Sequence, residues 1–456
     1  MNPALALLLA GCLVMQPTVA DSNPAPDRDS ARSPGAPTQA DASGVGVRLE
    51  RVGEGWRLLR HGEAVFLRGV GGSSRLEELK SLGGNAIRTW SVDQAEPVLD
   101  RAHELGVSVT VGLWLAHPRH GFDYNDTKAV EEQLQRQLRD VRRLKDHPAI
   151  LMWGIGNEVE LGMQGDRTVM WREVNRVARE VKKIDPSRPT MLVVAEVDPD
   201  KVREIKALCP DIDVLGINAY GGMDTAAFRA RRFGWDGPMA ITEFGPRGWW
   251  EVPQTRWPRE VGAVPIEPNS TEKADTYFSR YFAGIAENPR VIGSFAFLWG
   301  QKQECTHTWF GMFLPDGSRL GAADAMSFAW TGKWPENRCP RVWDVMLTGS
   351  RDLGVEGVAP GEKLIGSISA SDPDDEPVIF SWEVKEESSD RRTGGDREAV
   401  PPTVPTDFAV STPSPTQAKA EFKAPDRPGR YRLFMYVRDA QGNAATANVP
   451  FFVRTP

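Results

Sequence analysis

The stretch His147-Pro-Ala-Ile-Leu-Met-Trp-Gly-Ile-Gly-Asn157-Glu158 is an apolar run that ends abruptly in an amide and a carboxylate. A second run, Pro238-Met-Ala-Ile-Thr-Glu243-Phe-Gly245, reaches a carboxylate in the same way. Nearly continuous apolar runs of this length are typical of strands that are buried on both faces of a parallel sheet. Carboxylates at the carboxyl ends of such strands would lie where a (β/α)8 barrel carries its functional groups.

Similar runs alternate with amphipathic segments from Ala64 to about Pro340. We expect strands at Val65–Val70, Ala86–Trp90, Ser108–Leu115, Ile150–Gly156, Thr190–Ala195, Val214–Ala219, Met239–Thr242 and Ile292–Trp299. We expect helices at Leu76–Leu82, Ala95–Leu105, Ala129–Lys145, Val169–Ile184, Val202–Leu208 and Lys273–Glu287. Eight strands separated by helices predict an α/β fold, a (β/α)8 TIM barrel. An open Rossmann-type sheet is the alternative, but Gly69-Val70-Gly71-Gly72 does not fit GxGxxG.

The chain changes character after Trp343, where short alternating runs are separated by Pro, Gly and Asp turns. This pattern predicts a small all-β, immunoglobulin-like sandwich. Within it, Glu386 to Pro402 is polar and Pro-rich, which predicts a disordered loop. The sequence therefore divides into a signal peptide (1–20), a disordered linker (21–43), a barrel with an N-terminal hairpin (44–340) and a β-sandwich accessory domain (341–456).

The N-terminus indicates export. Ala4–Val14 is too short to span a bilayer but suits the core of a signal peptide. Leu9-Ala10-Gly11-Cys12 resembles the bacterial lipobox, which implies a lipidated Cys12. An ordinary signal peptide that ends near Ala20 is the alternative. Both place the protein in the bacterial periplasm, on the outer membrane as a lipoprotein, or outside the cell, and a membrane would be a partner only through the anchor.

Composition excludes several classes of function. The 456 residues carry a net charge of -7, which argues against non-specific nucleic-acid binding. The four cysteines form no CxxC pair and the six histidines no HExxH, so we expect neither a metal nor another cofactor. Cys305 and Cys339 flank the segment after the last barrel strand, and an oxidising compartment would allow them to form a disulfide. Cys209 is expected to be a buried thiol.

The paired glutamates at the ends of the fourth and seventh strands resemble those of clan A glycoside hydrolases, especially families 2 and 5. Three further strand ends match that family pattern: Arg88 in Asn85-Ala-Ile-Arg-Thr-Trp90, Tyr220 in Gly216-Ile-Asn-Ala-Tyr, and Trp299 in Phe295-Ala-Phe-Leu-Trp. The resemblance covers roughly Ala64 to Trp334. The sandwich, with Ser371-Asp-Pro-Asp-Asp and Val437-Arg-Asp-Ala-Gln-Gly-Asn, resembles PKD and cadherin-like modules, whose Asp clusters sometimes bind calcium; ordinary turns are the alternative.

The resemblance implies a retaining glycosidase that hydrolyses O-glycosyl bonds with two carboxylates. Glu243 would be the nucleophile and Glu158 the acid/base. Arg88 and Tyr220 would hold and orient Glu243, while Asn157 suits the 2-hydroxyl of the sugar. Helix or loop capping and a structural ion pair are the alternative roles for these residues.

The 15 Trp residues suggest platforms for sugar rings. Trp90, Trp114 and Trp299 lie at or near strand ends, and Trp249, Trp250, Trp257 and Trp309 lie in the last loops. We expect Trp299 to stack on the sugar that is cleaved. His117, in His117-Pro-Arg-His120, is a candidate for contacts with sugar hydroxyls. For several of the tryptophans, the alternative is that they anchor loops in the protein core, and for His117 it is an incidental position in a loop.

An aromatic mouth without charged clusters favours a β-linked glucan or a related polysaccharide or oligosaccharide as the substrate. A β-glucan transglycosylase would use the same residues and is one alternative. A surface lipoprotein that binds polysaccharide without cleaving it is another.

Overall fold

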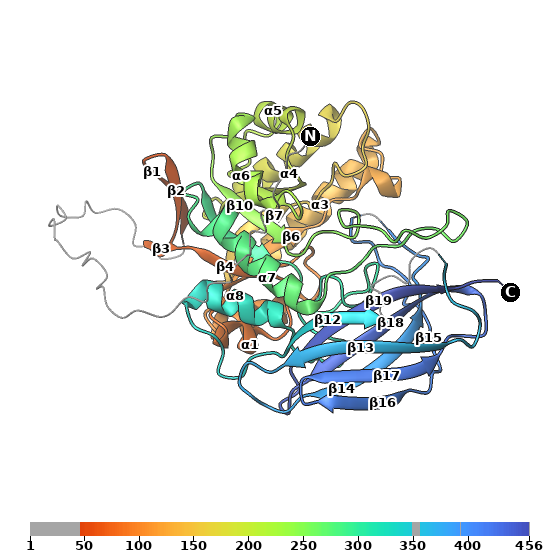
Figure 1. Cartoon of the computed structure of the whole chain (residues 1–456). Coiled ribbons are helices and arrows are strands. Elements are labelled where there is room, and N and C mark those ends of the chain that lie inside the picture. The colour runs from red at the N-terminus through yellow and green to blue at the C-terminus, as the bar shows by residue number, and fades with distance from the viewer. Residues whose placement is uncertain (1–45, 349–355, 393, 456) are drawn as a thin grey trace, which may run out of the picture. The chain divides into compact units, whose positions relative to one another are not determined.

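The computed structural model describes residues 46–348, 356–392 and 394–455. The predicted signal peptide, the linker and Cys12 lie outside the described residues. Eight parallel strands form a closed barrel in the order β10-β11-β4-β5-β6-β7-β8-β9. They are β4 (Leu67–Gly71), β5 (Ala86–Arg88), β6 (Ser108–Leu113), β7 (Ile150–Ile155), β8 (Thr190–Ala195), β9 (Val214–Asn218), β10 (Met239–Phe244) and β11 (Val291–Ala296). The predicted TIM barrel is thereby confirmed (Figure 1).

Helices follow the strands. They are α1 (Leu76–Ser81), α2 (Ala95–Glu104), α3 (Thr127–Leu144), α4 (Thr168–Ile184), α5 (Pro199–Leu208), α6 (Met223–Arg232), α7 (Ser270–Tyr281) and α8 (Gly321–Thr331), with short η1 (Pro118–His120) and η2 (Phe282–Ala286). The sequence did not predict α6 and α8. It also extended the last strand to Trp299, whereas β11 ends at Ala296.

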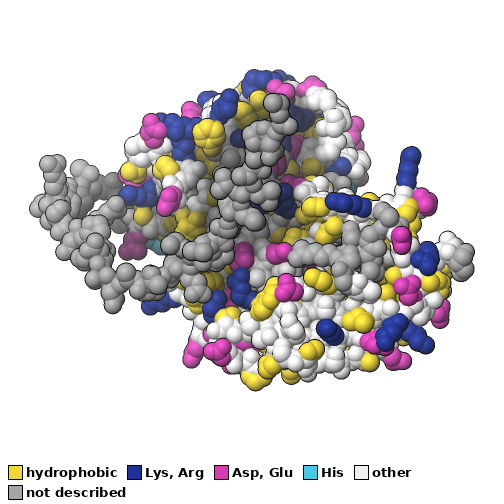
Figure 2. All heavy atoms as spheres, viewed as in Figure 1, with side chains coloured by type: hydrophobic (Ala, Val, Ile, Leu, Met, Phe, Trp, Pro, Cys, Tyr) yellow, Lys and Arg dark blue, Asp and Glu magenta, His cyan; other side chains and the backbone are white. Residues whose placement is uncertain are grey.

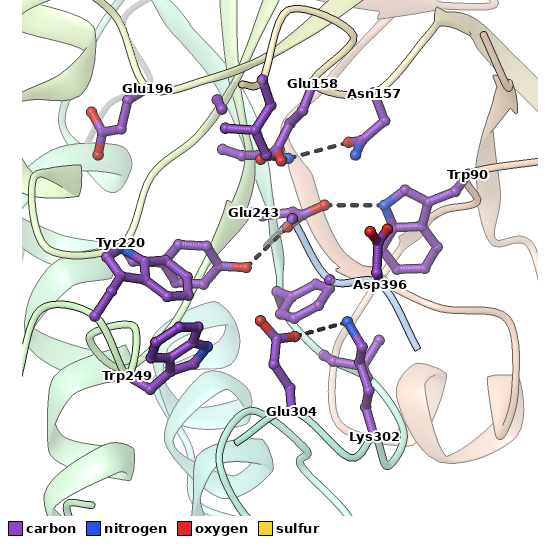
Figure 3. A pocket seen from close by; sticks show the side chains of 18 of the residues that line it. Trp90, Asn157, Glu158, Glu196, Tyr220, Glu243, Trp249, Lys302, Glu304 and Asp396 are labelled. Atoms are coloured by element: carbon purple, nitrogen blue, oxygen red, sulfur yellow. Dashed lines mark hydrogen bonds and ion pairs between the residues drawn. The ribbon is translucent and has the colours of Figure 1, made fainter. Parts of the chain in front are cut away.

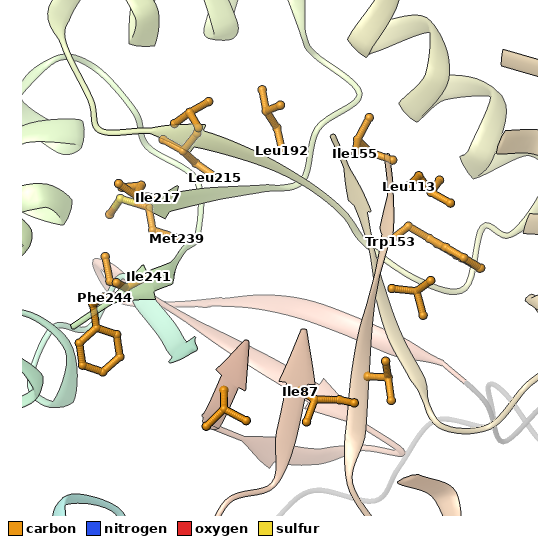
Figure 4. Close-up of a cluster of buried hydrophobic side chains, with 14 of the residues drawn as sticks. Ile87, Leu113, Trp153, Ile155, Leu192, Leu215, Ile217, Met239, Ile241 and Phe244 are labelled. Atoms are coloured by element: carbon orange, nitrogen blue, oxygen red, sulfur yellow. The ribbon is translucent and has the colours of Figure 1, made fainter. Parts of the chain in front are cut away.

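Alternate residues of the barrel strands enter two different hydrophobic clusters. In β8, Leu192 and Val194 belong to the cluster that includes helix residues, while Met191 and Val193 belong to a second cluster. This alternation follows from the period of two along a strand, since successive side chains point to opposite faces. Figure 4 shows the first cluster around the strands, with Trp153, Leu215 and Phe244 among its side chains. Burial on both faces explains why these strands have nearly continuous apolar sequences.

A three-stranded antiparallel sheet covers the amino-terminal end of the barrel. It consists of β1 (Val47–Val52), β2 (Gly55–Arg60) and β3 (Glu63–Val65). The amide of Val47 donates to the carbonyl of Ser187, just before β8. The amide of Trp56 donates to the carbonyl of Pro289, just before β11. The opposite, carboxyl-terminal end of the barrel carries Glu158 and Glu243.

The C-terminal region is an all-β sandwich, as predicted. One antiparallel sheet has the order β12-β13-β17-β16 and the other the order β15-β14-β18-β19. Their strands are β12 (Arg341–Leu347), β13 (Lys363–Ser371), β14 (Ile379–Glu386), β15 (Thr403–Val404), β16 (Ala409–Ser414), β17 (Gln417–Lys423), β18 (Gly429–Arg438) and β19 (Ala444–Val453). In the Asp-rich turns, Asp372 accepts a hydrogen bond from the amide of Asp374, and Asp439 accepts bonds from the amides of Gln441 and Asn443.

The described cysteines do not form the expected bridge. Cys209, Cys305 and Cys339 are free and buried. The sulfur of Cys339 bonds to the carbonyl of Arg319, whereas the amide of Cys305 donates to Glu398 of the sandwich. The prediction of a Cys305–Cys339 disulfide is therefore wrong for this structure, and the prediction of a buried thiol at Cys209 is confirmed.

Acidic and basic side chains are interspersed on the face shown in Figure 2, as the mild net charge suggests. Among the described residues, no helix has the length and apolar character needed to cross a membrane.

A buried carboxylate joins the barrel to the sandwich. Glu267, in the segment between β10 and α7, accepts hydrogen bonds from Lys273, Thr306 (2.6 Å), Thr308 (2.8 Å) and, from β19, Asn448 (2.7 Å). Burial alone would raise the pKa of Glu267, but the positive charges of Lys273 and Arg432 outweigh it and lower the pKa to about 2. The ionised carboxylate therefore stabilises this junction.

We expect Glu267→Gln to lower the free energy of unfolding by about 3–5 kcal/mol, because Lys273 would remain buried without its counter-charge. Urea unfolding followed by tryptophan fluorescence measures the loss. Because folding lowers this pKa, the stabilisation is complete above the ordinary value of 4.5 and disappears as the pH falls towards about 2. Between pH 4.5 and about 2, the free energy of unfolding of the wild type should therefore fall towards that of the variant. Glu287→Gln, at an exposed carboxylate, is the control, and equal unfolding midpoints at pH 7 would contradict the prediction.

Candidate active site

A cavity of about 720 Å³ opens at the carboxyl-terminal end of the barrel. Its volume lies within the range of roughly 300–1,000 Å³ that is usual for small-ligand sites. The described residues that line it are Trp90, Trp114, Asn157, Glu158, Leu161, Ala195, Glu196, Asn218, Tyr220, Glu243, Trp249, Trp250, Phe297, Leu298, Lys302, Glu304, Gly394, Gly395 and Asp396. Both predicted carboxylates therefore face one cavity, and Figure 3 shows them at its centre.

Glu243, in β10, receives three hydrogen bonds through its carboxylate. Arg88 Nη1 donates to Oε1 at 3.1 Å, and Trp90 Nε1 donates to the same oxygen at 3.0 Å. The hydroxyl of Tyr220 donates to Oε2 at 2.9 Å. Arg88 is 2% exposed, so its charge acts on Glu243 with little screening by water. Donors from the ends of two other strands, β5 and β9, thus stabilise the carboxylate and fix its orientation.

Glu158 has a different environment. It follows β7 with a backbone φ of 49°, a left-handed conformation that is costly for a residue other than glycine. Its Oε1 accepts one hydrogen bond, from Asn218 Nδ2 at 2.8 Å. Burial, followed by the negative charge of Glu243, raises the pKa of Glu158 to about 8. Glu158 therefore retains its proton at neutral pH.

A short network of side chains connects the two carboxyl groups. Arg88 donates to Asn157 Oδ1 at 2.5 Å, and Asn218 Nδ2 donates to the same oxygen at 3.2 Å. The hydroxyl of Thr242 donates to Asn218 Oδ1 at 2.8 Å, which directs the amide nitrogen of Asn218 towards Glu158. Since the described bonds use the oxygen of Asn157, its amide nitrogen is available to a ligand in the cavity.

Aromatic side chains form much of the cavity wall. Trp90, Trp114, Trp249 and Trp250 line it, as expected of tryptophans near the strand ends and in the late loops. Trp299 does not: it is 1% exposed, and its Nε1 donates to the carbonyl of Ser74 at 2.9 Å. The prediction that Trp299 forms the platform is wrong because β11 ends three residues earlier, at Ala296. Phe297 lines the cavity at that strand end instead.

His117 also lies outside the cavity lining. It is 1% exposed and stacks behind Trp114, with 4.7 Å between the ring centroids. Burial, followed by the charge of Arg119, lowers the pKa of His117 to about 4, so the ring is neutral. The expected contact of His117 with sugar hydroxyls is therefore wrong. Its position makes it a support for Trp114.

The sequence missed four charged residues in the cavity. They are Glu196, Lys302, Glu304 and Asp396. Lys302 Nζ pairs with Glu304 Oε2 at 2.8 Å, and Arg229, which lies outside the cavity, binds Glu196. Asp396 comes from the sandwich. The expectation of a mouth without charged clusters was thus wrong. The sequence did not reveal these residues because they are in loops far apart along the chain. Asn218 was missed too, although a polar residue at the end of an apolar strand, two positions before Tyr220, is a recognisable signal.

The arrangement is suited to acid/base and nucleophilic chemistry at one bound molecule. A carboxylate that accepts three hydrogen bonds and a carboxyl with a raised pKa share the cavity, and their neighbours maintain this difference. Within the described part of the chain, no group of three or more His, Cys, Asp or Glu side chains is arranged to hold a metal ion.

Comparison with known proteins identifies the barrel type. Residues 74–245 match the family model described as "Glycosyl hydrolases family 2, TIM barrel domain". A β-glucuronidase of Paenibacillus borealis is 28% identical over 274 residues, which cover 54% of this chain and 41% of that protein. The human β-glucuronidase is 30% identical over 146 residues, or 31% of this chain and 20% of that protein. A β-galactosidase of Vibrio cholerae is 24% identical over 284 residues, or 58% and 24%.

The matched region spans less than half the length of each of these relatives. Among solved structures, Bacteroides uniformis β-glucuronidase 2, covalently bound to cyclophellitol-6-carboxylate aziridine, matches with a TM-score of 0.49 and 15% identity. That match covers 90% of this chain and 48% of the other. The predicted resemblance to clan A glycoside hydrolases is confirmed by the family model, which includes both Glu158 and Glu243.

We expect Glu243→Gln to lower the pKa of Glu158, because the substitution removes the neighbouring negative charge and leaves the positive charge of Arg88 in place. Difference infrared spectroscopy, which detects the protonated carboxyl, measures the titration midpoint from pH 5 to 9. Glu196→Gln is the matched control, since Glu196 lines the same cavity but its carboxylate is paired with Arg229. A midpoint that moves equally in both variants would show that Glu243 is not the source of the effect.

Proposed function

We propose that this chain, with its barrel of the glycosyl hydrolase family 2 type, is a retaining β-glycosidase that hydrolyses O-glycosyl bonds. The proposal rests on one observation: a single cavity holds a carboxylate that accepts three hydrogen bonds and a carboxyl whose pKa is raised, first by burial. Double displacement needs these two states in adjacent groups.

In the first step, a Glu243 oxygen forms a bond to the anomeric carbon while the bond to the leaving oxygen breaks. Glu158 gives its proton to that leaving oxygen, so the departing sugar is a neutral alcohol. A covalent glycosyl-enzyme and an ionised Glu158 result. In the second step, Glu158 takes a proton from water as the water oxygen attacks the anomeric carbon and releases Glu243.

The neighbouring residues suit these steps. A pKa of about 8 keeps Glu158 protonated at neutral pH before it acts as an acid. Arg88, Trp90 and Tyr220 hold Glu243 in one orientation for attack. The free amide nitrogen of Asn157 is suited to donate to the 2-hydroxyl of the sugar, a contact that strengthens in the transition state.

For the substrate, we propose a β-linked glucan or a related polysaccharide. The tryptophans that line the cavity support it, because flat indole rings pack against the apolar faces of sugar rings. A screen of β-1,2-, β-1,3-, β-1,4- and β-1,6-linked glucans and of mannans, with products identified by mass, tests this. Products longer than the substrate, formed only when an acceptor sugar is present, would identify a transglycosylase instead.

A polysaccharide-binding protein without catalysis is the second candidate. Wild-type protein that binds glycan and yet equals Glu243→Gln in every activity assay would establish it. The unequal surroundings of the two carboxyl groups favour catalysis, because simple binding does not need that difference.

We also propose that the protein is exported and anchored through Cys12, on the resemblance of Leu9–Cys12 to a lipobox. In a bacterial host, Cys12→Ser should move the protein from the membrane fraction to the soluble fraction, because the acyl chains provide the attachment. Equal distribution of both forms would contradict the anchor and leave the ordinary signal peptide.

The two glutamates should respond differently to the quality of the leaving group. Glu158→Gln should reduce kcat/KM by about 10²–10⁴-fold on substrates with poor leaving groups, because the proton is no longer supplied. It should have much less effect on aryl glycosides whose phenolate leaves unaided. Glu243→Gln should abolish turnover of both classes, since the covalent step is lost.

Steady-state kinetics on an aryl glycoside series measure this difference, and proton NMR of the first product gives its anomeric configuration. A product of inverted configuration, or identical leaving-group dependence in the two variants, would disprove the assigned roles. Glu196→Gln serves again as the control for loss of a carboxylate in the cavity.

A further inference from the structure

One wall of the cavity comes from the sandwich and not from the barrel. The segment between β14 and β15 reaches the barrel mouth, where Gly394, Gly395 and Asp396 line the cavity (Figure 3). This segment is the stretch that the sequence predicted to be a disordered loop. In the structure, it contacts the barrel loops that follow β6 and β11, through Arg119 with Asp396 and through Cys305 with Glu398.

Asp396 is held firmly at this position. Arg119 Nη1 lies 2.8 Å from Asp396 Oδ2, and Arg119 Nη2 lies 3.1 Å from Oδ1, a two-point contact that fixes the plane of the carboxylate. His120 Nε2 lies 2.8 Å from Oδ2. The side chain of Asp396 remains 29% exposed, so a bound molecule can reach it. Burial would raise the pKa of Asp396, but the bonds from His120 and Arg119 outweigh it and lower that pKa.

The loop is also fixed on either side of Asp396. Glu398 accepts hydrogen bonds from the amide of Cys305 at 2.7 Å and from the amide of Arg392 at 2.9 Å. Glu387, at the base of the loop, binds Arg432 at 2.8 Å and 3.0 Å, and both side chains are 1% exposed. Since these contacts are buried, the loop presents Asp396 to the cavity as a preformed group.

The titratable groups that line the cavity are mostly acidic. Glu196, Glu243, Glu304 and Asp396 line it together with Glu158, and Lys302 is the basic residue among the described lining residues. Lys302 already pairs with Glu304. The arginines beside the cavity are engaged as well: Arg88 binds Glu243, Arg119 binds Asp396 and Arg229 binds Glu196. Each of these described cations is therefore already paired with a carboxylate, and a sugar that carries a carboxylate would approach the acidic side chains at close range.

We propose that Asp396 is a substrate-binding residue that the sandwich supplies to the barrel, where it accepts hydrogen bonds from sugar hydroxyls and excludes sugars that carry a carboxylate. Arg119 is its positioning residue. The inference rests on the proposed glycosidase function and specifies its substrate class as uncharged glycans. It predicts a preference opposite to the activity for which the β-glucuronidase relatives are named.

The test uses aryl β-glycosides in pairs that differ only at C6: glucoside with glucuronide, and galactoside with galacturonide. The wild type should favour the neutral member of a pair by at least about 100-fold in kcat/KM, because like charges a few ångströms apart repel strongly in a partly buried site. Asp396→Asn should raise KM for the neutral substrate by about 10- to 100-fold, the usual effect of losing a hydrogen bond to a charged group. Its kcat should change little.

Asp396→Asn should also reduce the ratio of kcat/KM for the neutral substrate to kcat/KM for the charged one. The reduction should be largest at low ionic strength, because one negative charge has been removed. Asp390→Asn is the matched control, since Asp390 is in the same loop, pairs with Arg392 and does not line the cavity. Arg119→Gln should raise KM in the same direction as Asp396→Asn, and the double variant should be no worse than the single ones. Thermal unfolding confirms that each variant is folded.

A wild type that prefers the uronides, or an Asp396→Asn variant that equals Asp390→Asn on both members of a pair, would overturn the proposal. Failure of the proposed function gives a different result: the wild type would hydrolyse neither the aryl glycosides nor the glucans. Calorimetry with cellobiose and laminaribiose would then still test Asp396. The inference would be overturned if the wild type and Asp396→Asn bound these disaccharides with equal affinity, or if neither protein bound them.

Discussion

Two carboxyl groups in one cavity cannot both be ionised without a large cost, because little water screens the repulsion between them. The structure resolves this conflict by giving the two groups unequal partners. Glu243 receives donors from Arg88, Trp90 and Tyr220, whereas Glu158 receives one amide hydrogen from Asn218. The surrounding donors, which come from the ends of β5 and β9, maintain this inequality. The barrel provides it because parallel strands bring distant parts of the chain to one rim.

The fold was predictable because its main signals are local. A strand buried on both faces has to be almost entirely apolar, so the polar residue that ends the run is easy to recognise. This signal identified five residues that the structure brings together: Arg88, Asn157, Glu158, Tyr220 and Glu243. The helix α8 was missed because apolar residues lie all around it, which leaves little helical periodicity. The helix α6 was missed although its apolar periodicity is similar to that of α5 and α7.

The errors have a common cause in register and long-range contact. In an extended strand Phe297 and Trp299 would share one face. The chain leaves the strand after Ala296, however, so Phe297 lines the cavity and Trp299 is buried. His117 does not line the cavity, but Arg119, two residues later, pairs with Asp396, which does. No local pattern could reveal Asp396, because its partner Arg119 is 277 positions away in another domain.

The contacts of that distant loop make the sandwich part of the site and not a mere spacer. Arg432 of β18 binds Glu387 at the base of the loop, and the same guanidinium donates to the carbonyl of Pro265 in the barrel at 3.0 Å. One buried cation thus fixes both the loop and the position of the sandwich on the barrel. A shift of the sandwich would have to break this contact and the bonds of Glu267 with Asn448 before it moved Asp396. Because these groups are buried, breaking their bonds is costly, so the stability of the domain junction and the shape of the cavity are determined by the same interactions.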